Sequence, residues 1–87
     1  MKSHTTPEFW RCHDALPQNV QRLAAREFSK WRNNPHHPGL HFKRIHASEQ
    51  IYSVRIGIHW RAIGRLDAET VTWFWIGSHS DYDRLIG

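Results

Sequence analysis

Hydrophobic residues recur at helical spacing in the first third of the chain. Pro7 stands where the first turn of a helix accepts proline, and Thr5 and Thr6 are suitable caps before it. The spacing predicts a short helix over residues 7–16, and Pro17 separates it from a second, longer helix. The apolar stripe of the second helix consists of Val20, Leu23, Ala24, Phe28 and Trp31. Together the two segments predict a helical hairpin.

Beyond residue 39 the pattern changes from helical spacing to alternation, which is typical of strands. Four strands joined by short turns are expected, at about residues 40–46, 51–56, 60–65 and 70–77. In the second strand, Tyr52, Val54 and Ile56 form the predicted dry face. Ser53 and Arg55 fall on its solvated face.

The last predicted strand is apolar on both of its faces, which is typical of a strand inside a sheet. Strict alternation assigns one face to Val71, Trp73 and Trp75. The other face receives Phe74 and Ile76. This strand is therefore expected to have a neighbour on each side.

The chain closes on a short helical pattern. Ser80 and Asp81 are suitable caps for a last turn that holds Tyr82, whereas residues 2–5 are too few to establish a first strand. The order of elements predicts an α+β fold, in which an N-terminal helical hairpin packs on a twisted antiparallel sheet of three to five strands, followed by a short C-terminal helix. At this length we expect residues 1–87 to form a single domain.

Composition favours a folded protein of the cytoplasm. The sequence is 39% hydrophobic and 13% aromatic, which argues against disorder. Its single cysteine, Cys12, excludes an internal disulfide, as is usual in a reducing compartment, and its place in a helical pattern indicates a packing role. No apolar run approaches the ~20 residues of a membrane span, so we expect a soluble cytoplasmic protein with no membrane partner.

Positive charge is concentrated in the middle of the chain. Residues 22–65 hold nine Lys or Arg and two Glu, whereas residues 66–87 hold one Arg and four Asp or Glu. This distribution indicates an acidic partner, either nucleic acid or an acidic protein that covers the basic segment. We interpret the helical cations as a solvated face, and the strand arginines as candidates for a binding site.

The sequence contains eight histidines, three of which, His36, His37 and His41, lie close together. Imidazole is a common zinc ligand, but no cysteine pair and no regular spacing accompanies these residues. We therefore expect no metal site.

Two motifs, with the elements around them, resemble the toxins of the RelE/ParE superfamily of bacterial toxin–antitoxin systems. The first is YSVRIG over residues 52–57, followed by Trp60 and Arg61, and the second is Gly77-Ser78-His79, followed by Tyr82. The resemblance covers most of the chain and implies the fold predicted above. In RelE-like members it implies a ribosome-dependent ribonuclease that cleaves mRNA, needs no metal or other cofactor and is silenced by a cognate antitoxin. ParE-like members share the fold but inhibit DNA gyrase, so fold alone does not decide function.

The resemblance also suggests roles for individual residues. Arg61 matches the catalytic arginine of the family and would stabilise the charged phosphorane, with Arg55 and Arg65 as supporting cations. His79 would act as the general acid, because histidine titrates near neutral pH. Tyr82 would stack on a base or bond the phosphate. The remaining candidates for binding the RNA backbone are Lys43 and Arg44.

Several of these residues have a structural alternative. Arg55 can be an exposed strand residue, His79 can cap the last helix, and Tyr82 can belong to the core. Some family nucleases carry a carboxylate base in the segment that enters the sheet, whereas this chain has histidines there, of which His41 is one substitute. The leading hypothesis is a toxin that cleaves mRNA on the ribosome. The alternatives are a gyrase inhibitor and a non-toxic module that binds nucleic acid or an antitoxin.

Overall fold

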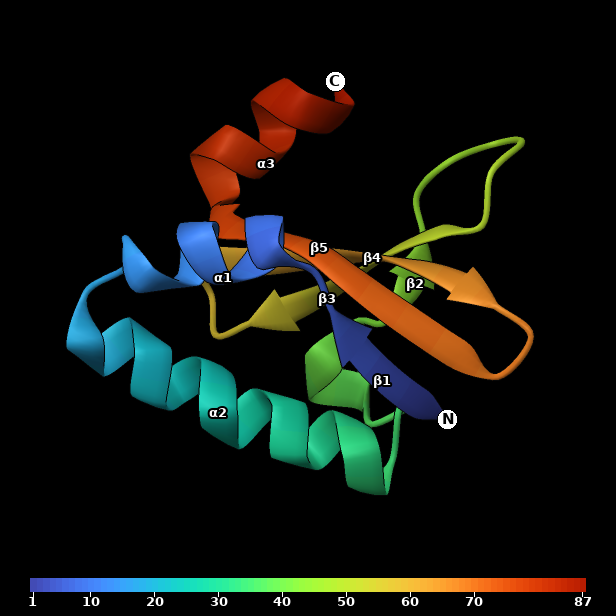
Figure 1. Cartoon of the computed structure of the whole chain (residues 1–87), viewed down its shortest axis with the longest axis horizontal. Helices are drawn as coiled ribbons and strands as arrows, with labels where there is room; N and C mark the ends of the chain where they lie inside the picture. Colours follow the sequence, from blue (N-terminus) through green and yellow to red (C-terminus); the bar gives the residue numbers. More distant parts are fainter.

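The computed structural model describes residues 1–87, which form a five-stranded sheet between two helical layers (Figure 1). The strand order is β1-β5-β4-β3-β2. In Figure 1 α2 lies below the sheet, α3 lies above it, and α1 runs beside β5. The elements in chain order are β1 (Lys2–Thr5), α1 (Pro7–Asp14), α2 (Gln18–Asn33), the 3₁₀ helix η1 (Pro38–Leu40), β2 (Lys43–Arg44), β3 (Ile51–Ile56), β4 (Trp60–Asp67), β5 (Thr70–Ser78) and α3 (His79–Ile86).

The α+β fold class is confirmed, with one addition to the predicted sheet. β2, β3, β4 and β5 are antiparallel neighbours, whereas β1 pairs with β5 in parallel. The sheet is therefore mixed. β1 consists of residues 2–5, which were too few to establish a strand from the sequence alone. Because β1 pairs only with Thr70–Trp73, it covers half of β5 and makes that strand an internal one.

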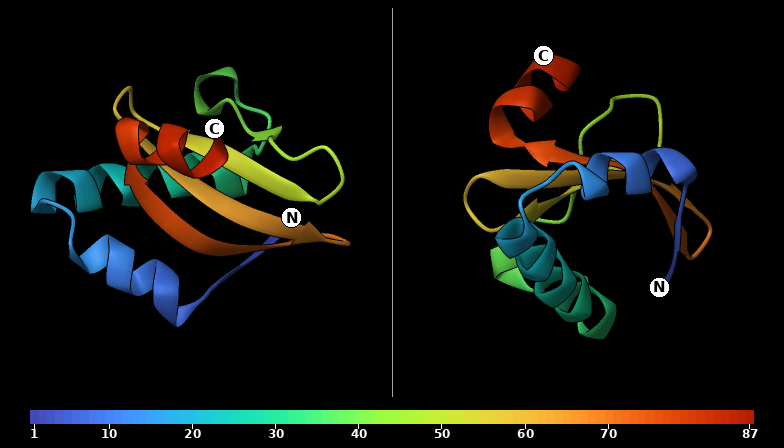
Figure 2. Two further views of the ribbon diagram at one scale, coloured as in Figure 1. Left: turned by 90° about the horizontal axis from the view of Figure 1, so that it is seen from above. Right: turned by 60° about the vertical axis from the view of Figure 1, so that its left-hand side comes forward.

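Both helices of the hairpin form where the sequence predicts them. Thr6 caps α1, because its Oγ1 accepts a hydrogen bond from the N–H of Phe9 at 3.1 Å. One face of α1 and one face of α2 pack on the sheet, and Figure 2 shows α2 on the side of the sheet away from α3, with α1 running beside the strands. The common core includes Phe9, Ala24, Trp31, Val54, Ile56, Ala62, Val71 and Trp73.

The strand expected over residues 40–46 is shorter than predicted. Only Lys43 and Arg44 pair with β3, because η1 continues as far as Leu40 and His41 has a left-handed backbone. Leu40 is fully buried beneath this turn, so its hydrophobicity reflects an anchor rather than a strand. A single buried residue followed by alternation gives the same short pattern as a strand.

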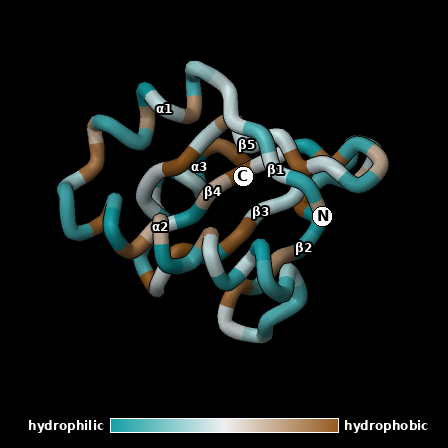
Figure 3. The backbone as a smooth tube through the Cα atoms, turned by 60° about the horizontal axis from the view of Figure 1, so that its bottom comes forward, coloured by the Kyte–Doolittle hydropathy of each residue, from teal (hydrophilic) through white to brown (hydrophobic).

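A bulge corrects the predicted faces of β5. The register between β4 and β5 shifts at Ile63 and Gly64, which leaves Phe74 as the additional residue of β5. Trp73 remains in the core with Val71, but Trp75 lines a cavity on the other face together with Phe74. Alternation from Trp73 to Trp75 is interrupted by the bulge, which a pattern of alternating residues cannot reveal. Figure 3 shows hydrophobic and hydrophilic positions along the strands and α2.

The last helix begins earlier than predicted and covers the second face of the sheet. Its cap is Ser78, whose Oγ accepts the N–H of Asp81 at 3.1 Å, rather than Ser80 or Asp81. Because α3 lies over this face, Ser53 is 2% exposed and not solvated as predicted. None of the helices combines the length and apolarity needed to span a membrane.

The close packing of β4 on β5 depends on Gly64. A Cβ at this position would lie 2.6 Å from Val71 Cγ1 and 2.8 Å from Trp73 Cε3, both of which are buried. We expect Gly64→Ala to lower the free energy of unfolding by about 1–3 kcal/mol through overpacking. Urea unfolding measures this change. Gly39→Ala is the control, since its Cβ would make ordinary contacts, and equal effects of the two changes would contradict the packing described here.

Candidate nucleic-acid interface

A pair of arginines lies on the face of the sheet opposite the helical hairpin. Antiparallel pairing of β3 and β4 places Arg55 directly across from Arg61. Their neighbours Val54, Ile56 and Ala62 point into the core, so alternation turns both arginines to the other face. Like charges opposite each other on neighbouring strands are unfavourable, and an anion bound between them would relieve this repulsion.

Arg61 is partly buried and held in one orientation. Its Nη1 donates to the carbonyl oxygens of Trp60 at 2.8 Å and Ile58 at 3.2 Å. Burial and then the charge of Arg55 lower the pKa of Arg61, while Tyr82 and Asp83 act in the opposite sense. An arginine side chain nevertheless stays protonated at neutral pH. The result is a fixed, partly desolvated cation, which attracts phosphate more strongly than a fully solvated one.

Arg55 is also oriented by the backbone and by a histidine. Its Nε donates to the carbonyl oxygen of Gly57 at 3.3 Å, and its Nη1 donates to Nε2 of His41 at 3.4 Å. The strand therefore supplies the cation, and the segment between η1 and β2 supplies an imidazole beside it. From the sequence, His41 was suggested only as a substitute for the carboxylate base that some family nucleases carry.

The start of α3 brings two further predicted residues to the same region. His79 is exposed, its N–H donates to the carbonyl oxygen of His59 at 2.7 Å, and its Nε2 lies 3.3 Å from Oδ2 of Asp83. Tyr82 is 5% exposed, and its hydroxyl donates to Ser53 Oγ at 3.1 Å. Its ring faces that of His79, with centroids 6.3 Å apart. Tyr82 thus packs against the sheet, which favours the structural alternative over stacking on a base.

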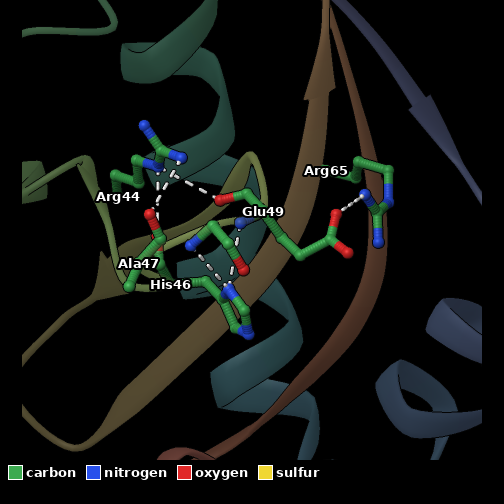
Figure 4. Close-up of polar contacts among 6 residues, drawn as sticks. Arg44, His46, Ala47, Glu49 and Arg65 are labelled. Carbon is green, nitrogen blue, oxygen red and sulfur yellow. Dashed lines mark hydrogen bonds and ion pairs between the residues drawn. The ribbon is translucent and has the colours of Figure 1, made fainter.

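Two of the predicted backbone-binding arginines organise a loop instead (Figure 4). The Nε of Arg44 donates to the carbonyl oxygens of His46 and Glu49, both at 3.1 Å, and its Nη2 donates to that of Ala47 at 3.4 Å. Arg65 Nη1 lies 2.9 Å from Oε2 of Glu49. These contacts engage the guanidinium groups of Arg44 and Arg65. Neither side chain therefore belongs to the pair formed by Arg55 and Arg61.

Lys43 differs from these arginines because its side chain is exposed and forms no ion pair with a carboxylate. Its partner in the sheet is Ser53, two residues before Arg55, so it faces the same side as the arginine pair. Lys43 is therefore a free cation beside the candidate site. No three His, Cys, Asp or Glu side chains are grouped closely enough to hold a metal ion.

An apolar cavity of about 490 Å³ lies on the same face of the sheet, next to α3. Its walls come from the loop before β3, from β3 to β5 and from the end of α3, where Leu85 and Ile86 are exposed. Such walls suit a protein segment better than a phosphate backbone. The face thus combines a cationic part around Arg61 with an apolar part beside Leu85.

The fold corresponds to that of solved toxins of toxin–antitoxin systems. YafQ from Escherichia coli BL21(DE3) is 10% identical, with a TM-score of 0.73, and the match covers 93% of this chain and 96% of that one. RelE in the RelB–RelE antitoxin–toxin complex of Methanococcus jannaschii is 12% identical, with a TM-score of 0.75 and coverage of 97% and 99%. The RelBE2 complex of Mycobacterium tuberculosis gives 17% identity, a TM-score of 0.73 and coverage of 90% and 96%. At these identities the similarity establishes the fold.

The family follows from a match of the sequence itself. The family model described as the ParE-like toxin domain matches residues 18–84, from the start of α2 into α3. The chain belongs to this family of toxins, within the RelE/ParE superfamily. No curated protein sequence matches the chain significantly.

The ion pair of Arg65 and Glu49 provides a test of the loop described above. Hydrogen bonding to Arg65, and then its charge, lowers the pKa of Glu49. Since the folded pKa is depressed, the pair stabilises the fold above the unfolded pKa, and this contribution is lost as pH falls through the folded pKa. We expect Arg65→Gln to raise the pKa of Glu49 in an NMR titration of carboxyl carbons. Lys43→Gln is the control, and an unchanged pKa in Arg65→Gln would show that the pair is absent in solution.

Proposed function

We propose that this protein is the toxin of a type II toxin–antitoxin system and acts as a metal-independent endoribonuclease that cleaves mRNA on the ribosome. The observation that carries this proposal is the fixed and partly buried guanidinium of Arg61 opposite Arg55. Two oriented cations on a rigid sheet suit a phosphate that gains charge during cleavage. Family membership supports the toxin assignment.

Cleavage of RNA without a metal needs a base for the 2′-hydroxyl, cations for the phosphorane and an acid for the leaving 5′-oxygen. Arg61 supplies the main stabilising charge and Arg55 the supporting one. His79 is the general acid in its imidazolium form: its Nε2 donates to Asp83, and its Nδ1 carries the proton that is transferred. Tyr82 holds α3, and with it His79, against the sheet through its bond to Ser53.

Two classes of partner fit the face around this site. The mRNA backbone on the ribosome would follow Lys43 and the arginine pair, and no cofactor is required. A cognate antitoxin would cover the apolar cavity beside Leu85 and Ile86. An antitoxin partner is supported by structural neighbours that were solved as toxin–antitoxin complexes. The protein would act in the cytoplasm, where it meets translating ribosomes.

Loss of cleavage in Arg61→Ala tests the proposal. We expect the rate of mRNA cleavage on programmed ribosomes to fall by about 10²–10³-fold, because one preorganised charge is removed from the transition state. Growth arrest on expression should be lost in parallel. Arg26→Ala, an exposed change on the outer face of α2, is the control and should remain toxic.

Three further measurements separate this proposal from a folding defect and from the two alternative functions. Arg61 lies opposite Arg55 and is only partly buried, so Arg61→Ala should still fold cooperatively, which thermal unfolding checks. Inhibition of DNA supercoiling without RNA cleavage by the wild-type protein would indicate a gyrase inhibitor. Harmless expression of the folded wild-type protein would indicate a non-toxic binding module.

A further inference from the structure

His41 has no role in the reaction as described so far, yet it contacts the arginine pair. Nη1 of Arg55 lies 3.4 Å from Nε2 of His41. A guanidinium can only donate, so Nε2 accepts, which requires the neutral ring with its proton on Nδ1. The site therefore contains an imidazole whose electron pair on Nε2 is engaged by Arg55 and becomes available when that guanidinium turns to a bound phosphate.

The backbone of His41 is strained and is fixed on both sides. Its φ of 45° and ψ of 46° are left-handed, a conformation that is unfavourable for a residue with a side chain. Leu40 before it is fully buried, and the ring of Phe42 after it stacks on Tyr52 with centroids 5.0 Å apart. These two anchors hold the chain and turn the side chain of His41 outward. Strain of this kind is concentrated at functional sites.

The sheet also places His41 on the side of the arginine pair away from His79. β2 pairs with β3 through Lys43 and Ser53, and His41, two residues before Lys43, contacts Arg55 on β3. Arg61 follows on β4, and His79 follows the end of β5. The order across the sheet is thus imidazole, guanidinium, guanidinium, imidazole. In-line cleavage at phosphorus needs a base on one side of the phosphate and an acid on the other.

We propose that His41 is the general base of the reaction, an inference that rests on the proposed ribonuclease function. Arg55 turns from Nε2 of His41 to the phosphate, and Nε2 then takes the proton of the 2′-hydroxyl. O2′ forms a bond to phosphorus, and the bond from phosphorus to O5′ breaks. The proton held by His79 passes to O5′. The products are a 2′,3′-cyclic phosphate and a 5′-hydroxyl, and no further reactant is consumed.

The other histidines of this loop are engaged elsewhere. Nδ1 of His37 accepts the N–H of Gly39 at 3.2 Å and caps η1. The ring of His36 faces Phe42, with centroids 6.3 Å apart. Neither histidine contacts Arg55 or Arg61, so His41 is the imidazole of this segment that reaches the pair.

His41→Asn is the decisive variant. Asparagine tolerates the left-handed backbone, and its side-chain oxygen can accept from Arg55, but it cannot take up a proton at neutral pH. We expect the single-turnover rate of mRNA cleavage on programmed ribosomes to fall by at least about 10²-fold. Co-sedimentation with ribosomes carrying a 2′-O-methyl message, which cannot be cleaved, should be unchanged. His36→Asn, in the same loop, should cleave like the wild type.

The pH profile and a second variant exclude a merely structural role. The acidic limb of the rate profile should disappear in His41→Asn, where Arg55 is the charged group in contact with the replaced ring. His41→Gly relieves the backbone strain, so it should keep its melting temperature and recover cleavage when imidazole is added. Wild-type cleavage by His41→Asn, or a loss of ribosome binding that equals its loss of cleavage, would overturn the proposal. If the wild-type protein itself does not cleave, the proposed ribonuclease function fails instead.

Discussion

The repulsion between two guanidinium groups on neighbouring strands is the constraint around which this protein is arranged. Arg55 and Arg61 face each other because Val54, Ile56 and Ala62 occupy the core on the opposite side of the same strands. A register slip of one residue would exchange the two faces and bury the arginines, so the hydrophobic pattern enforces the unfavourable pair. The core that fixes the register therefore also maintains the site, and no local contact has to hold the two cations together.

The second face of the sheet is completed by α3. The buried hydrogen bond from Tyr82 to Ser53 joins this helix to β3, two residues before Arg55. His79 and Asp83 come with the helix, and the carboxylate of Asp83 offsets part of the charge of Arg61. Figure 1 shows α3 projecting from the sheet on the side away from α2. The cationic and apolar parts of this face are consequently neighbours, which brings the site and the cavity beside Leu85 within reach of one partner.

Much of the fold could be predicted from the sequence, because the helical hairpin and β3 to β5 have strong periodic patterns and clear turns. The bulge that moves Trp75 could not, since it depends on how β4 and β5 pair at Gly64. For the site, the motifs led to Arg61, Arg55 and His79, which lie in one region. The motifs did not separate Arg65 from these site residues. Its guanidinium pairs with Glu49, which lies in a loop without a regular sequence pattern. The contact of His41 arises from a left-handed turn, for which the sequence carries no signal beyond a proline and a glycine nearby.

The most direct test of this account is a structure of the protein on a ribosome that carries a 2′-O-methyl message. The account predicts that one phosphate of the message lies between the guanidinium groups of Arg55 and Arg61, with its neighbouring 2′-oxygen on the side of His41 and its 5′-oxygen on the side of His79. A message bound along the helical hairpin, or a phosphate that contacts neither arginine, would contradict it.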